Sequence, residues 1–166
     1  YLEYKLKSVL QLINKTARSN YGQLQLKWRR KMLIQWNNCT ASQLSKLIKE
    51  SIVVFAIGSC EQHSHYLPVG TDTLIGERLL LEAASKAKEK ILILPTITFG
   101  YSMHHTNFSG YITLKQDTIK KIIIDVCDSL YAQSVKEIII LNSHGGNQSV
   151  LQVAINEIWE KNKKSP

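Results

Sequence analysis

A short polar stretch that directly follows an apolar run carries residues able to bind a metal ion. Glu61 and His63 stand two positions apart, so their side chains point the same way on an extended chain, and Asp72 follows eleven positions after Glu61. His144, after another apolar run, offers a further imidazole. Carboxylates together with imidazoles are typical ligands of zinc, manganese or iron rather than of magnesium or calcium. We therefore predict that these four residues bind divalent metal.

A bridging carboxylate at Asp72 could serve two ions about 3.5 to 4 Å apart, and water between two such ions is a nucleophile near neutral pH. Gly145 and Gly146 would let backbone amides approach a substrate closely, and Asn147 stands near a predicted helix N-terminus, where the dipole favours negative charge. We predict that these three residues bind substrate. The alternative for these three residues is a plain tight turn. The alternatives for each predicted metal ligand taken alone are a helix-capping residue, an ion-pair partner or a hydrogen-bonded loop residue.

The other histidines and Ser102 give weaker indications of function. His104 and His105 follow the second predicted strand and either face substrate or form a solvated loop pair. His65 makes a His-Ser-His pair with His63, as in zinc-binding (β/α)₈ barrels, but that fold needs about 200 residues or more, and the chain has 166. The stretch around Ser102 lacks the second glycine of a nucleophile elbow.

Apolar periodicity predicts the elements that must position these residues. Continuous apolar runs predict strands at residues 52–57, 91–97 and 138–141. Helices are predicted at residues 40–50, 74–89, from 113 onward and 150–161, the first and third opened by capping boxes of Thr40 with Gln43 and of Thr113 with Gln116.

Alternating strands and helices predict an α/β fold, with a mainly parallel sheet covered on both faces in three layers, α/β/α. Ligands of such sheets bind beyond the carboxyl ends of the strands. Both histidine-bearing runs, around His63 and around His144, follow strands at that edge. This convergence predicts that they form one site.

Length and composition limit the number of domains and the class of protein. A chain of 166 residues with 44% apolar residues suits one soluble domain, and its longest apolar runs are far shorter than the roughly 20 residues of a membrane span. Three cysteines without a CxxC pair favour a reducing compartment, so we expect a cytoplasmic protein.

Charge is concentrated in the first 31 residues, which hold eight Lys or Arg against one acidic residue; residues 32–166 hold thirteen against twelve. The predicted domain, residues 32–166, is therefore nearly neutral, which makes nucleic-acid binding the weakest hypothesis. Residues 1–31 are interpreted as a basic extension, either a helix that contacts a partner or a segment foreign to the native domain. Met32 is then the expected native start.

The motifs resemble those of the creatininase (creatinine amidohydrolase) family. The run from Gly58 to Asp72 is similar to its GSxEQHGxHLPxxTD signature, the segment from His105 to Gly110 to HxxFPGT, and the segment from Asn142 to Asn147 to NGHGGN. The three motifs occur in order, and the resemblance runs from about residue 32 to the end of the chain.

The resemblance implies a metal-dependent hydrolase that cleaves a non-peptide amide bond, as in a small cyclic amide, a formamide or a creatinine-like substrate. It implies two divalent ions, zinc, manganese or iron, with Glu61, Asp72 and His144 on one, and with His63 and the bridging Asp72 on the other. His105 would orient substrate as a catalytic residue. Family members are often homohexamers, so a homo-oligomer without a membrane partner is expected.

Several positions depart from the family pattern. Ser64 replaces a glycine, and Tyr66 replaces a histidine, with His65 one position earlier. The family's C-terminal HAGxxET-type run, which supplies a further glutamate ligand, is not found in this sequence. We therefore expect a partial, C-terminally truncated domain, and the alternative function is a non-catalytic relative that binds metal or contributes to a homo-oligomer.

Overall fold

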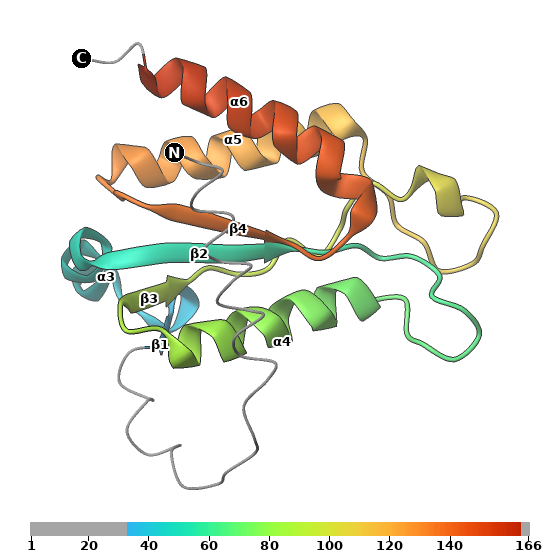
Figure 1. Ribbon diagram of the computed structural model, residues 1–166, viewed down its shortest axis with the longest axis horizontal. Helices are drawn as coiled ribbons and strands as arrows, with labels where there is room; N and C mark the ends of the chain where they lie inside the picture. Colours follow the sequence, from blue (N-terminus) through green and yellow to red (C-terminus); the bar gives the residue numbers. More distant parts are fainter. Residues whose placement is uncertain (1–32, 164–166) are drawn as a thin grey trace, which may run out of the picture.

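The computed structural model describes residues 33–163 and arranges them in three layers (Figure 1). A sheet forms the middle layer, helix α4 (Thr71–Lys86) covers one face, and helices α5 (Gln116–Ala132) and α6 (Gln148–Lys163) cover the other. The predicted α/β/α architecture is confirmed. Within residues 33–163, none of the helices combines the length and apolar character that crossing a membrane requires.

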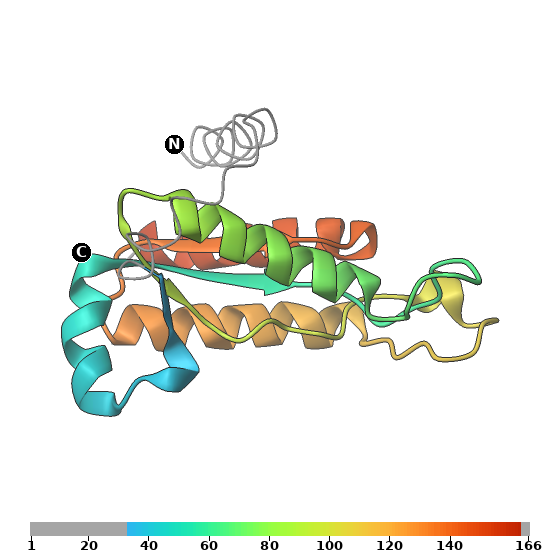
Figure 2. The same ribbon diagram turned by 90° about the horizontal axis from the view of Figure 1, so that it is seen from below.

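The sheet has four parallel strands in the order β1-β3-β2-β4. Their bounds are Leu33–Gln35 for β1, Ser51–Ile57 for β2, Lys90–Ile93 for β3 and Ile138–Asn142 for β4. Because β2 lies between β3 and β4, the loops that follow these three strands meet at one edge of the sheet. In both views the loops after β2 and β3 extend past this edge (Figures 1 and 2).

Strand β2 is buried on both faces, as its continuous apolar sequence predicts. Phe55 and Ile57 pack in a cluster with residues of α5 and α6, whereas Val54 and Ala56 pack with residues of α4. This alternation is the two-residue period of an extended strand. The core therefore holds β2 firmly, and the loop that begins at Gly58 starts from a fixed point.

Helix α3 (Ala41–Leu47) begins as the sequence predicts. Thr40 Oγ1 accepts a hydrogen bond from the Gln43 backbone N–H, and the Gln43 side chain accepts one from the Thr40 N–H, which completes the capping box. A short 3₁₀ helix, η2 (Ile48–Glu50), continues α3 to the start of β2. The predicted helix over residues 40–50 is thus one α-helical segment with a 3₁₀ end.

The second predicted capping box is wrong. Helix α5 begins at Gln116 with Lys115 as N-cap, and no side chain caps it. The Thr113 hydroxyl instead accepts a hydrogen bond from the Ser102 backbone N–H at 2.8 Å, a partner from a distant part of the sequence. A tertiary hydrogen bond, which sequence spacing does not reveal, thus replaces the local capping contact.

Other boundaries also differ from the predictions. Helix α4 begins at residue 71 instead of 74, so Asp72 lies in its first turn instead of in a loop. Strand β3 ends at Ile93, before Pro95, and only Ile97 pairs again, as an isolated bridge to Ile57. Strand β1 was not predicted, and residues 1–31 lie outside the described part of the chain.

Candidate metal centre

Asp72 lies at the centre of the candidate site, in the first turn of α4. Its carboxylate contacts both predicted histidine ligands: Oδ1 lies 3.0 Å from His63 Nε2, and Oδ2 lies 2.8 Å from His144 Nδ1. The first turn of a helix favours a negative charge because the macrodipole is positive there. The two loops that the sequence analysis singled out therefore meet at one carboxylate.

A buried serine orients this carboxylate. Ser59, which is fully buried, donates a hydrogen bond from Oγ to Asp72 Oδ2 at 2.8 Å. Thr73, the next residue of α4, donates to the Ser59 carbonyl oxygen at 3.1 Å and so ties the helix start to the same loop. Outer contacts of this kind fix the direction of metal-binding side chains.

His63 is oriented through both ring nitrogens. Nδ1 lies 3.0 Å from the Glu61 carbonyl oxygen, and Nε2 faces Asp72. Burial lowers the pKa of the His63 imidazole, but the Glu61 carbonyl oxygen and the Asp72 carboxylate outweigh it, so the pKa is raised above its ordinary value. With Nδ1–H directed to the backbone, Nε2 is the nitrogen available to a metal ion.

Glu61 is the other buried acid of the site. It is 5% exposed, and His144 Nε2 lies 3.4 Å from its Oε2. Glu61, His63 and Asp72 each offer a ligand atom within 4.8 Å of the others, a spacing that could hold a metal ion. The structure thus brings together all four predicted ligands, and His144 contacts both acids.

Glycines allow the close packing around His144. A Cβ at Gly146 would lie 2.4 Å from His144 Nε2 and 2.3 Å from the Tyr101 carbonyl oxygen, so no larger residue fits without movement. Gly145 is exposed, and a Cβ there would meet nothing within 4 Å. Gly145 therefore faces open space beside the site.

Asn147 is fully buried and joins the three loops. Its side chain donates from Nδ2 to the Gly58 carbonyl oxygen at 3.0 Å and accepts at Oδ1 from the Tyr101 N–H at 2.9 Å. These contacts link the loops after β2, β3 and β4. In the structure the Asn147 side-chain amide binds backbone groups of two loops. The substrate contact predicted for Asn147 stays a prediction.

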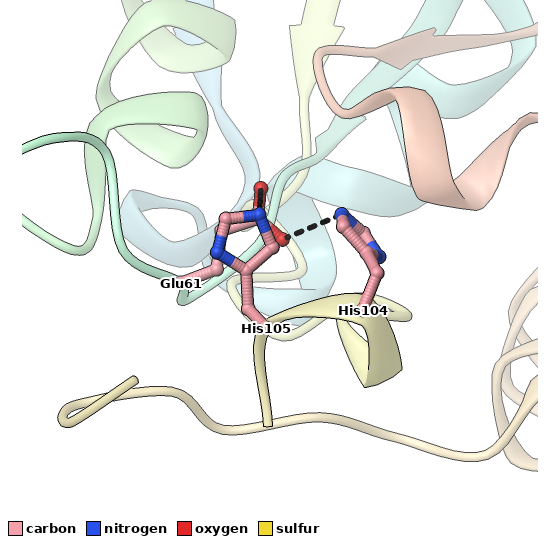
Figure 3. Close-up of side chains that lie close together, drawn as sticks. All are labelled: Glu61, His104 and His105. Carbon is pink, nitrogen blue, oxygen red and sulfur yellow. Dashed lines mark ion pairs between the residues drawn. The ribbon is translucent and has the colours of Figure 1, made fainter. Parts of the chain in front are cut away.

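The loop after β3 adds two histidines. His104 and His105 lie in the 3₁₀ helix η3 (Met103–His105) and turn their rings toward Glu61 (Figure 3). The sequence left open whether these rings face solvent or the site, and the structure places both at the site. His65, the partner of the alternative His-Ser-His pair, is exposed.

Ser64 occupies a conformation that suits glycine. Its φ is +62°, in the left-handed region, at the position where the family motif has a glycine. The turn geometry of the motif is thus kept although the residue differs.

Comparison with known proteins agrees with this fold. The creatininase family model, described as creatinine amidohydrolase, matches residues 37–166. The chain belongs to the creatininase family.

Three relatives show the range of the family. A mycofactocin precursor peptide peptidase from Mycobacterium tuberculosis is 31% identical over 126 residues, 71% of this chain and 49% of its own. A 3-dehydro-scyllo-inosose hydrolase from Thermotoga maritima is 24% identical, and the match covers 75% of this chain and 40% of the relative. A 2-amino-5-formylamino-6-ribosylaminopyrimidin-4(3H)-one 5'-monophosphate deformylase from Methanosphaera stadtmanae is 32% identical, and the match covers 61% of this chain and 43% of the relative. The chain thus spans less than half the length of these relatives.

Solved creatininase structures share the fold. A manganese creatininase superposes with a TM-score of 0.71 at 18% identity, over 77% of this chain and 52% of that one. A Zn-Zn form of a creatininase variant gives a TM-score of 0.71 at 18% identity, over 78% and 52%. At this identity the likeness concerns the fold alone.

Proposed function

We propose that this chain carries the metal-binding half of a divalent-metal-dependent hydrolase that cleaves a non-peptide amide bond. The observation that carries the proposal is the meeting of Glu61, His63, Asp72 and His144 at one edge of the sheet. The relatives named above are hydrolases; the deformylase among them favours a non-peptide amide, whereas the peptidase supports hydrolysis only in general. The Zn and Mn creatininase structures support zinc or manganese as the metal, and two ions as the number.

The donor set fits such a metal. Oε2 of Glu61 is buried and accepts no hydrogen bond from the described residues, and a buried carboxylate oxygen without one is costly. A divalent cation beside it would offset this cost, and two carboxylates with two imidazoles suit zinc, manganese or iron. When bound, such a cation supplies a water molecule that is activated for attack on a carbonyl carbon.

The chain's own residues would hold and orient the reactants. Ser59 fixes the Asp72 carboxylate, and the Glu61 carbonyl oxygen fixes the His63 ring, so both ligands are oriented before a cation binds. Gly145 and Gly146 stand before the N-terminus of α6, where backbone amides and the helix dipole favour a developing negative charge. His105, whose Nε2 lies 3.6 Å from Glu61 Oε1, would orient a substrate.

Apolar side chains exposed around the site support assembly into a homo-oligomer. The exposed set on the loops after β2 and β3 comprises Tyr66, Leu67, Val69, Phe99, Met103, Phe108, Tyr111 and Ile112. Exposed apolar patches of this kind mark interaction surfaces. The three cysteines are free, in keeping with the cytoplasmic location we propose.

The test is hydrolysis by the purified chain after loading with Zn²⁺ or Mn²⁺, with a chelator-treated sample as reference. Substrates are a formamide, a cyclic amide such as creatinine and, because of the mycobacterial relative, a short peptide. Asp72→Asn should lower the rate more than about a hundredfold, since even outer contacts of metal ligands are worth 10–100-fold.

Asp117→Asn is the matched control, because Asp117 is an exposed acid in the first turn of α5. It should leave the rate unchanged. If the chain binds the cation but hydrolyses none of the amides, the non-catalytic alternative is favoured and the enzyme proposal fails.

A further inference from the structure

Glu61 belongs to a second group of possible ligands besides the one that it forms with His63 and Asp72. His104 and His105 approach its carboxylate from the 3₁₀ helix η3, as Figure 3 shows. Each of the three residues offers a ligand atom within 4.8 Å of the others. We propose that Glu61, His104 and His105 bind a divalent transition-metal ion of their own, beside the ion centred on Asp72.

The distances fit an ion between the side chains better than direct hydrogen bonds. His105 Nε2 lies 3.6 Å from Glu61 Oε1, and His104 Nε2 lies 3.7 Å from Oε2. Both distances exceed the roughly 3.2 Å limit of a good N–H···O hydrogen bond. Ligand atoms around a tetrahedral zinc with bonds of about 2.1 Å are about 3.4 Å apart. A cation at this position would therefore need only a small inward movement of the rings.

A buried polar atom supports the same site. Glu61 Oε2 is buried and has no hydrogen-bond partner among the described residues. A cation at Nε2 of His105 and at the Glu61 carboxylate would compensate the buried charge of the acid. An anionic substrate group in the same place would instead meet the negative charge of Glu61. The electrostatics therefore favour a cation over an anion.

Ring contacts orient the two imidazoles without using their Nε2 atoms, and the His104 side chain stays half-exposed. The His104 ring stacks on the His144 ring, with centroids 5.8 Å apart and planes 6° apart. The centroid of the His105 ring lies 5.6 Å from that of Phe108 and 4.5 Å from that of His104, which it meets edge to face. Metal ligands oriented by surrounding packing lose less freedom when an ion binds.

The second site changes the roles of two residues. Glu61 belongs to both ligand groups, so its carboxylate would contact both ions, while Asp72 still joins His63 to His144. His105 would serve as a ligand instead of orienting the substrate directly. One carboxylate with two imidazoles suits zinc or another transition metal rather than magnesium or calcium. The site deepens the proposed function but does not depend on catalysis.

The test is titration of the chain with Zn²⁺ against a chromophoric chelator, which yields the number of bound ions and their affinities. The wild type should bind two ions. The double variant His104→Ala/His105→Ala should bind one, and Asp72→Asn should keep the ion at His104 and His105. His65→Ala is the matched control, because His65 is an exposed histidine that belongs to neither group; this variant should still bind two ions.

The outcomes separate the two proposals. If the double variant binds as many ions as the wild type with unchanged affinities, the second site is refuted, while loss of an ion in Asp72→Asn would still support the proposed metal centre. If the only ion is lost in the double variant and kept in Asp72→Asn, the Asp72 centre fails instead. A lower kcat in His105→Ala with an unchanged number of ions would assign substrate orientation to His105 and overturn its role as a ligand. Circular dichroism and urea unfolding of each variant exclude misfolding as the cause.

Discussion

The substitution Gly146→Ala should disturb the site through a single methyl group. The added Cβ would lie between the His144 ring and the Tyr101 carbonyl oxygen, 2.4 Å from His144 Nε2 and 2.3 Å from that oxygen. In the wild type these two groups are 2.9 Å apart and form a hydrogen bond. Ordinary contacts lie between 3.4 and 4 Å, so the neighbours must move by about 1 Å. Since His144 also contacts Asp72, this movement reaches the metal centre.

The magnitude follows from packing energies. An inserted methyl in a tight site costs about 1–3 kcal/mol, and the lower unfolded-state entropy of alanine returns about 0.4–1 kcal/mol. We therefore expect Gly146→Ala to lower the free energy of unfolding by about 1–2 kcal/mol. We also expect the affinity for Co²⁺ to fall about tenfold or more, which corresponds to about 1.4 kcal/mol.

The matched control is Gly145→Ala, one position earlier in the same turn. A Cβ at Gly145 meets nothing within 4 Å, so this variant should be as stable as the wild type or slightly more stable. Urea unfolding gives the stability of both variants, and titration followed by Co²⁺ absorption gives the affinity. If Gly146→Ala matches Gly145→Ala in both measurements, the close approach to His144 described here is refuted.

Two further predictions concern residues that are not themselves predicted metal ligands. Burial raises the pKa of the Cys127 thiol to about 11 from 9.0, so iodoacetamide at pH 8 should modify Cys39 and Cys60 in the folded chain and all three cysteines in urea, as counted by mass spectrometry. Because the folded-state pKa is raised, the stability that neutral Cys127 contributes is complete below pH 9 and is lost toward pH 11; equally rapid modification of Cys127 in the native chain would contradict its burial. Ser64→Gly should raise the free energy of unfolding by about 0.5–1 kcal/mol, because a non-glycine residue at positive φ costs about 1–2 kcal/mol and glycine returns part of this as unfolded-state entropy. Ser45→Gly, inside helix α3, should instead lower it by about 0.5 kcal/mol, and equal effects of the two changes in urea unfolding would argue against the backbone strain at Ser64.

The sequence was sufficient to predict the layers of the fold and the convergence of the four predicted ligands. A continuous apolar strand such as β2 must be buried on both faces, and parallel strands place their following loops at one edge. The order of Glu61, His63, Asp72 and His144 along the chain therefore predicted one site. The structure adds that Asp72 lies on a helix and contacts both histidines.

Features that depend on distant contacts could not be predicted from the sequence. Thr40 and Thr113 begin similar capping motifs, but only the Thr113 hydroxyl is engaged by a distant backbone N–H, that of Ser102. Strand β1 was missed because three residues are too few for a periodic signal, and its pairing with β3 defines it. The direction of His104 and His105 depends on the path of the whole loop after β3, which has no regular period.

The most direct test of the central claim is anomalous X-ray diffraction from crystals of the chain soaked with Zn²⁺. We predict a zinc peak within about 2.0–2.2 Å of an Asp72 carboxylate oxygen and of a ring nitrogen of His63 or His144. Such a peak would show that loops from β2 and β4 build one metal centre around the first turn of α4. Crystals with zinc bound elsewhere and no peak at Asp72 would contradict the account.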